Sequence, residues 1–316
     1  MILTGFLPES NIIQTSNTMD RTVIVDELTK LSTTSSQAMS INDNSSSITP
    51  IKIPLVSFEP ILATSPKYIL VNEFTKKRNQ LILVDDHLQK FIIRSSIKTT
   101  VLDALWYDNQ QQFLLLTSTN IFSFDPNTKK IQTLNDIIPM ENKTFKCFTL
   151  LNQSTLLIAY NEWGAEYIDR WQQNNEDGLW KLIERQPLKL TSNEFIGSIL
   201  TIIENDCLNL AIIIYNILTE QWRIEICHIE TLICNKAILL PGSNLMHDYR
   251  MISIRNTQSD IKWLAFSSIN SNIIAIDSEW KKIQLNYKHP VQRMAVFKDN
   301  YLIVRTTERV DIHMFL

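Results

Sequence analysis

The chain has 316 residues, a formal net charge of −3 and a hydrophobic fraction of 44%. This length and composition suffice for one large domain, or two ordinary ones, with a substantial core. The slightly acidic balance argues against nucleic-acid binding, which needs a clustered basic face, and against strong attraction to anionic lipid. The longest apolar run, Leu208 to Leu218, falls short of the roughly 20 residues that cross a bilayer. We therefore expect neither a nucleic-acid nor a membrane partner.

The first residues have no basic region followed by a continuous apolar run, so they do not resemble a secretory signal. We expect an intracellular, cytoplasmic protein. Its four cysteines, Cys147, Cys207, Cys227 and Cys234, lie in or near apolar strand-like segments. That placement predicts buried, reduced thiols and no disulfide framework.

Residues 1–47 differ from the rest of the chain because they are rich in Ser, Thr and Asn. Such a composition cannot bury a core and predicts a disordered tail. Within the tail, Thr18 to Leu31 is more apolar. It fits either a short helix capped near Asp20 or an extended peptide that docks on a partner, and a tail without a role is equally compatible.

Residues 48–316 alternate short apolar and aromatic runs with Asn, Asp, Ser, Pro and Lys, which is typical of strands and turns. An isolated strand is predicted from Ile48 to Leu55, followed by five units of four strands and a sixth unit of three. The second strands of the units begin near residues 67, 112, 154, 208, 261 and 300. Their spacing brackets the roughly 40–50 residues of a four-stranded propeller blade.

One sequence segment recurs within these units. The stretch NIFSFDPNTKKIQTL from Asn120 returns as NIIAIDSEWKKIQLN from Asn272, and it corresponds to the third strand, turn and fourth strand of a unit. An aspartate ends the third strand in three units, where its carboxylate is expected to accept backbone N–H groups of the turn; these residues are Asp85, Asp125 and Asp277. Lysines then open the outermost strand and discourage edge pairing; they are Lys129, Lys130, Lys281 and Lys282.

The pattern resembles the β-propeller class in its broad WD40-like and quinoprotein-like sense, and the resemblance covers residues 48–316. It implies an all-β, six-bladed propeller of four-stranded antiparallel sheets. The last unit lacks its fourth strand, so the N-terminal strand is expected to complete that blade and close the ring. The Gly-His and Trp-Asp dipeptides of WD40 repeats and the Gly-Gly pair of kelch repeats do not recur, so no named family is indicated. A pair of β-sandwiches is the alternative architecture.

Motifs for catalysis are missing from the sequence: it has no GxGxxG, GxxxxGK[ST], GxSxG or HExxH. The nearest metal-like group is Cys227, His228 and Cys234 with Cys207. Its spacing matches no structural zinc pattern, and adjacent strand residues face opposite ways. The five histidines, His87, His228, His247, His289 and His313, are scattered, and each is expected at the surface or half-buried in a strand.

The predicted innermost strands supply two acids, Glu59 and Asp103, so the carboxylate ring of a lactonase-type propeller is not evident. We expect no catalytic residue, cofactor or metal. The seven tryptophans are expected to pack between blades, with Trp163 as the exception because it lies in a predicted turn from Asn161 to Gly164. An exposed Trp is a good interface anchor.

Glu162, Trp163 and Trp171 are therefore the candidate protein-binding residues, and the alternative is that Trp163 folds back over the rim of the core. The same unit contains a long acidic loop from Gln172 to Trp180.

The function predicted from these features is a non-catalytic protein–protein interaction scaffold. It would present the loops of one propeller face to a partner protein or peptide, as a monomer or as a subunit of a complex. The alternative is a metal-dependent hydrolase or a small-molecule-binding propeller that uses the central channel.

Overall fold

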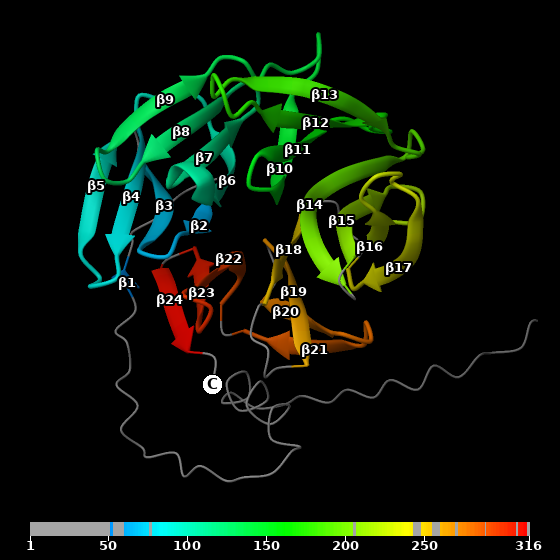
Figure 1. The fold of residues 1–316 in the computed structure, drawn as a ribbon. Coiled ribbons are helices and arrows are strands. Elements are labelled where there is room, and N and C mark those ends of the chain that lie inside the picture. The colour runs from blue at the N-terminus through cyan, green and yellow to red at the C-terminus, as the bar shows by residue number, and fades with distance from the viewer. Residues whose placement is uncertain are drawn as a thin grey trace, which may run out of the picture.

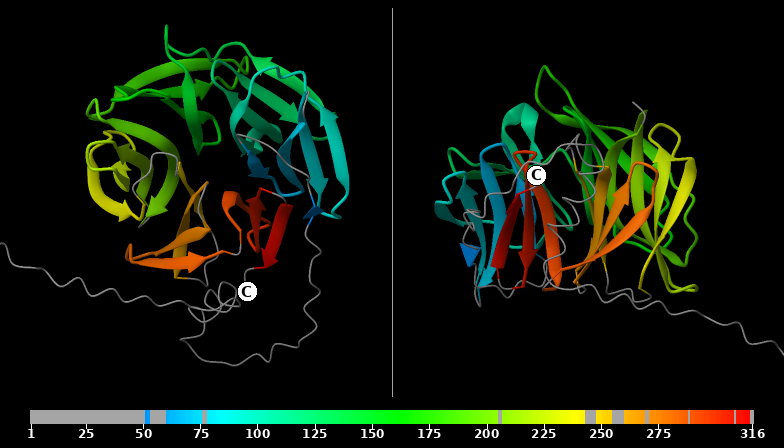
Figure 2. Two further views of the ribbon diagram at one scale, coloured as in Figure 1. Left: turned by 180° about the vertical axis from the view of Figure 1, so that it is seen from behind. Right: turned by 90° about the horizontal axis from the view of Figure 1, so that it is seen from below.

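In the computed structural model the chain forms six four-stranded antiparallel sheets arranged in a ring (Figure 1). The structure describes residues 51–52, 60–75, 78–204, 207–242, 248–254, 260–268, 271–287, 289–307 and 309–314. The expected six-bladed propeller is confirmed, and the sandwich alternative is wrong, because the sheets stand around a common axis and are not stacked in two layers (Figure 2). The predicted tail, with its segment Thr18 to Leu31, lies outside the described residues.

The strands of blades one to three are β2 (Leu62–Thr64), β3 (Tyr68–Thr75), β4 (Arg78–Asp85), β5 (Lys90–Arg94), β6 (Val101–Tyr107), β7 (Gln112–Thr117), β8 (Ile121–Asp125), β9 (Lys130–Leu134), β10 (Phe145–Asn152), β11 (Thr155–Tyr160), β12 (Tyr167–Gln173) and β13 (Trp180–Pro187). The strands of blades four to six are β14 (Glu194–Glu204), β15 (Cys207–Asn216), β16 (Gln221–His228), β17 (Cys234–Leu240), β18 (Tyr249–Ser253), β19 (Ile261–Ser267), β20 (Asn272–Asp277), β21 (Lys282–Asn286), β22 (Val291–Phe297), β23 (Tyr301–Thr306), β24 (Arg309–Met314) and β1 (Ile51–Lys52). Among the described residues the one helix is the short 3-10 turn η1 (Asp108–Gln110), so none is long and apolar enough to span a membrane.

Blades one to five each contain four strands that are consecutive in the sequence, with the first at the axis and the fourth at the rim (Figure 1). Blade six contains three consecutive strands and β1. Neighbouring blades cover both faces of each sheet. For that reason β11, with the sequence TLLIAY, is buried along its whole length. An apolar cluster fills each of the six seams between blades; the cluster between blades four and five, for example, is built around Trp222 and Trp263.

The ring closes between blade six and blade one. β1 pairs antiparallel with β24, with Ile51 opposite Val310 and Lys52 opposite Arg309, so the N-terminal strand completes the last blade as predicted. Of the predicted strand Ile48 to Leu55, the structure describes these two residues. Inside the same seam, Arg305 of β23 donates to the backbone carbonyl of Ile61, 2.7 Å away.

The turns between third and fourth strands confirm the structural role of the aspartates. The carboxylate of Asp125 accepts the backbone N–H of Asn127 at 2.8 Å. Asp277 accepts the N–H groups of Glu279 and Lys281 at 2.9 and 2.8 Å, and Asp85 accepts those of His87 and Gln89 at 3.0 and 2.7 Å. Each turn then contains a left-handed residue (Leu88, Lys129 or Trp280), so these turns reverse the chain without glycine.

Candidate interaction site on the Trp163 face

One face of the ring contains the turns between second and third strands and the links from each fourth strand to the next first strand. We call it the Trp163 face, because Trp163 lies in the turn that follows β11. The inner strands begin on this face. Residues near the starts of these strands therefore lie close to the axis on this face.

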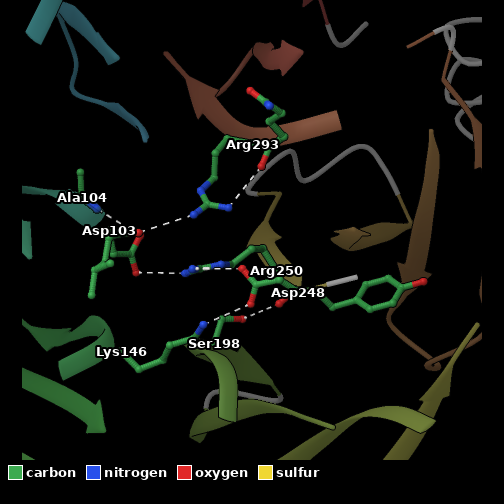
Figure 3. A network of polar contacts seen from close by, with 10 residues as sticks. Asp103, Ala104, Lys146, Ser198, Asp248, Arg250 and Arg293 are labelled. Carbon is green, nitrogen blue, oxygen red and sulfur yellow. Dashed lines mark hydrogen bonds and ion pairs between the residues drawn. The ribbon is translucent and has the colours of Figure 1, made fainter. Parts of the chain in front are cut away.

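A cluster of charged side chains lies at the axis near this face, and we call it the axis cluster (Figure 3). It combines Asp103 of β6, Lys146 of β10, Arg250 of β18, Arg293 of β22, and Asp248, which directly precedes β18. These residues come from four blades, so only the closed ring brings them together. Sequence reasoning missed all but Asp103, because it counted acids on the inner strands and not cations.

β-bulges lie at or beside three of these side chains. The register of β6 shifts between Val101 and Asp103, and that of β10 shifts between Phe145 and Cys147, which leaves Lys146 as the bulged residue. The register of β22 shifts in the same way just before Arg293. A bulge bends the strand and re-aims the next side chains, which is how apolar strands can present charges to the channel.

The charges of the axis cluster are paired loosely. Arg250 Nη1 lies 3.5 Å from Asp103 Oδ2, and Arg250 Nη2 lies 3.5 Å from Asp248 Oδ2. Lys146 Nζ lies 3.4 Å from the other oxygen of Asp248. Arg293 donates to the backbone carbonyls of Gln292 and Leu102, at 3.2 and 3.5 Å. With every group ionised, three cations outnumber two carboxylates.

The cations decide the ionisation of Asp248. Burial raises the pKa of its carboxyl group, but the charges of Arg250, Lys146 and Arg293 outweigh that effect and bring the pKa below its ordinary value. Both carboxylates of the cluster thus serve as partners for cations. Among the described residues of the axis, the two carboxylates are paired with cations and do not form the carboxylate ring of a lactonase-type propeller.

Trp163 lies at the seam between blades three and four. It forms an isolated antiparallel bridge with Phe195 of β14, and its ring centroid lies 5.5 Å from that of Phe195. The ring of Tyr215 is 6.4 Å away on its edge. The next residue, Gly164, donates to the carbonyl of Glu194 at 2.7 Å. Trp163 nevertheless keeps 41% of its surface exposed, so its indole is held firmly on one side and open to solvent on the other.

The seam connects Trp163 to the axis cluster. Lys146 Nζ lies 4.9 Å from the centroid of Phe195, the ring that Trp163 contacts. The neighbouring turn of blade four adds two exposed apolar residues, Ile217 and Leu218. The Trp163 face therefore combines an apolar anchor near the seam with charges at the axis.

The other two candidate binding residues are placed differently. Glu162 lies beside Trp163, and one carboxylate oxygen is 2.8 Å from Lys143 Nζ. Trp171 is 5% exposed and belongs to the apolar cluster between blades two and three, so the structure does not bring it to the surface that Trp163 occupies. The acidic loop from Gln172 to Trp180 joins the third and fourth strands and thus lies on the opposite face of the ring.

The cysteines require a correction. Cys227 and Cys234 were expected as reduced thiols, but they form a disulfide across β16 and β17. Cys147 is a buried free thiol as expected, whereas Cys207 is free and exposed. The two cysteines pair because their strands form a hairpin that sets them directly opposite one another, which spacing alone did not reveal.

The histidines lie where they were expected. His87 and His228 are exposed, and His289 and His313 are half-buried, while His247 falls outside the described residues. His313 contacts Tyr287 at 2.8 Å, and burial lowers the pKa of its imidazole. Glu59, the other predicted channel acid, also lies outside the described residues.

Comparisons with solved structures support the fold alone. A streptogramin B lyase matches with a TM-score of 0.55 at 8% identity, over 84% of this chain and 96% of its own. A chain of a mitotic checkpoint complex matches with a TM-score of 0.56 at 10% identity, over 89% of this chain and 96% of its own. Hydrazine synthase of Kuenenia stuttgartiensis matches with a TM-score of 0.54 at 11% identity, over 87% of this chain and 80% of its own.

No protein-family model matches the sequence, and no curated protein matches it. The ring of six four-stranded sheets defines the chain as a six-bladed β-propeller. The matched propellers include enzymes and a member of a protein assembly, so the fold does not choose between those functions.

Proposed function

We propose that this propeller is a non-catalytic binding platform that receives a partner protein or peptide on its Trp163 face. The observation that carries the proposal is Trp163 itself. Its indole is exposed on one side and packed against Phe195 and Tyr215 on the other. A rigid aromatic side chain loses little conformational entropy on binding, which is why tryptophans are enriched among interface hot spots.

The surroundings of Trp163 fit this role. Interfaces have an apolar centre and a polar rim. Exposed Ile217 and Leu218 extend the apolar surface toward blade four, and the Lys143–Glu162 pair lies at its polar edge. Loops on a rigid frame are where binding residues gather, and the six apolar seams provide that frame.

The test compares Trp163→Ala with Leu179→Ala in the full chain. Leu179 is 47% exposed and lies in the same blade, but its turn is on the opposite face, so it is a matched control. Truncating a hot-spot tryptophan costs about 2 kcal/mol or more, which corresponds to roughly a thirtyfold loss of affinity. We expect quantitative affinity purification to lose partners with Trp163→Ala and keep them with Leu179→Ala.

Thermal unfolding should show that both variants are folded at the temperature of the assay, with a lower midpoint for Trp163→Ala because it loses the contacts with Phe195 and Tyr215. If partners survive Trp163→Ala and disappear with Leu179→Ala, the opposite face is the binding surface. If both variants keep every partner at wild-type strength, Trp163 is not an anchor and the proposal is wrong.

A further inference from the structure

The disulfide between Cys227 and Cys234 lies on the face opposite Trp163, where β16 turns into β17. Among the described residues, one set of three side chains has the donor atoms of a metal site close together, and it contains both cysteines. The Glu225 carboxylate and the Sγ atoms of Cys227 and Cys234 all lie within 4.8 Å of one another. Glu225 and Cys227 are two positions apart on β16, so they share a face of the strand. His228 faces the other way.

The hairpin holds the two sulfurs together independently of the disulfide bond. Lys236 pairs with Ile226, and Ala237 with Glu225, directly beside the cysteines. The turn itself is closed by the bond from the His228 N–H to the carbonyl of Ile233 at 3.0 Å. Buried Leu232 anchors this turn in the seam between blades three and four. Reduction would therefore leave two thiols side by side on a folded scaffold.

The accessibility of the two cysteines sets the order of reduction. Cys234 is exposed and Cys227 is fully buried. A thiolate reductant attacks Cys234 Sγ, forms a mixed disulfide there and releases Cys227 as a thiolate. A second reductant thiolate then resolves the mixed disulfide, so two electrons and two protons convert the disulfide to two thiols.

We propose that the reduced form binds a thiophilic divalent cation, such as Zn²⁺, through Cys227, Cys234 and Glu225. Zinc takes bonds of about 2.3 Å to sulfur and about 2.0–2.2 Å to a carboxylate oxygen, and three protein ligands leave its fourth position for water. Two thiols release two protons on binding the metal. The disulfide occupies the same sulfur atoms, so oxidation and metal binding exclude each other.

The positive charge of Arg223 near the site does not prevent a cation from binding there. That guanidinium lies 2.7 Å from a Glu225 oxygen, but it also lies 2.7 Å from Glu194, whose charge balances it. Glu225 and two thiolates then carry three negative charges against the two positive charges of the metal. Thiolate ligands are what distinguish such a site from the exposed carboxylate groups common on protein surfaces.

The experiment uses the full chain, reduced with a phosphine, desalted without oxygen and titrated with Co²⁺ and then Zn²⁺. We expect a sulfur-to-cobalt charge-transfer band with a one-to-one endpoint, which Zn²⁺ abolishes by displacement. Glu225→Gln should weaken Co²⁺ binding by roughly tenfold or more, the loss that even supporting residues of a metal site produce. Cys234→Ser should remove the band. Cys207→Ser is the matched control, because this exposed cysteine is outside the site, and it should titrate like the wild type.

Circular dichroism of each reduced variant establishes that the propeller is still folded before titration. The oxidised protein should show no band. A reduced, folded wild type without the band overturns the proposal, and so does a Cys234→Ser variant with wild-type affinity. Glu225→Gln with wild-type affinity removes the carboxylate from the site and overturns the three-ligand assignment. None of these outcomes depends on partner binding at Trp163.

Discussion

At the residue scale, the pKa values of two aspartates, Asp169 and Asp248, are shifted in opposite directions by burial and by neighbouring charges. Asp169 of β12 is fully buried, accepts a 2.6 Å hydrogen bond from the Tyr160 hydroxyl and lies 3.3 Å from Arg185 Nε. Burial raises the pKa of Asp169 more than Tyr160 and Arg185 lower it. At Asp248 the neighbouring cations lower the pKa more than burial raises it, so the pKa is below its ordinary value. As pH rises, the stabilising contribution of Asp169 is therefore lost, whereas that of Asp248 is gained.

The first prediction follows from the raised pKa of Asp169. A group whose folded-state pKa lies above its unfolded value stabilises the fold below the unfolded pKa, and this contribution is lost as pH rises through the folded pKa. Asparagine does not titrate, and its carbonyl still accepts from Tyr160. We expect the free energy of unfolding of Asp169→Asn to fall less than that of the wild type as pH rises from about 4 to 7, measured by urea denaturation.

Asp248→Asn is the control with the opposite sign. A lowered folded pKa stabilises the fold above the unfolded value near 3.8 and loses that contribution as pH falls through the folded pKa. This variant should be less stable than the wild type at neutral pH, and the difference should shrink in acid. If the free energy of unfolding of both variants changes with pH in the same way as that of the wild type, the assigned pKa shifts of Asp169 and Asp248 are wrong.

At the element scale, bulges interrupt the inner strands β6, β10, β14 and β22. In β14 the bulge falls between Ile196 and Ser198, and the bulged residue is Gly197. A Cβ at Gly197 would lie 2.7 Å from the Cζ3 atom of Trp222, which is fully buried and cannot move aside easily. The small residue thus allows the strand to bulge against the core of the next seam.

We accordingly predict that Gly197→Ala destabilises the protein by about 1–3 kcal/mol, the usual cost of overpacking a core. Gly178→Ala is the control: its φ is +71°, but no atom lies within 4 Å of the added methyl group. Its cost should be the backbone term alone, about 1 kcal/mol. Urea denaturation measures the free energy of unfolding of both variants. If the two variants lose equal stability, the Trp222 side chain moves aside to accommodate the added methyl group.

At the scale of the whole molecule, the seam between blades six and one determines whether the ring is closed. Arg305 is fully buried there, and its guanidinium donates to Ile61 O at 2.7 Å and Asn72 Oδ1 at 2.6 Å. These acceptors belong to blade one and Arg305 to blade six. The side chain thus joins segments that are more than 230 residues apart in the sequence.

We predict that Arg305→Met lowers the free energy of unfolding by about 3 kcal/mol, because it leaves buried acceptors without their charged donor. Lys298→Met is the matched control at the same seam. Lys298 pairs with Asp86 at 3.1 Å, but both groups are partly exposed and screened by solvent, so its loss should cost much less than that of Arg305. A loss for Arg305→Met no larger than that of the control would show that the closing seam does not depend on this residue.

Two details of the candidate site mark the limit of what could be predicted from the sequence. Asn161 to Gly164 was expected to be a turn, because turn chemistry is local. Whether Trp163 would be exposed or fold back over the rim was left open, and the structure shows it packed on one side and 41% exposed. Trp171 lies eight residues away on β12, and which of its faces is buried depends on the packing of blade two against blade three.

The sequence by itself determined the number of blades, the strand order within each and the closing strand, because strand alternation, turn residues and repeat length are properties of short segments. Only the tertiary structure decided which charges meet at the axis, because Asp103, Lys146, Arg250 and Arg293 lie on four separate blades. Three of them also lie at or beside bulges of their strands. The tertiary structure also decided the partner of Cys227, since the β16–β17 register shifts between Ile226 and Cys227, and this shift places Cys234 opposite Cys227.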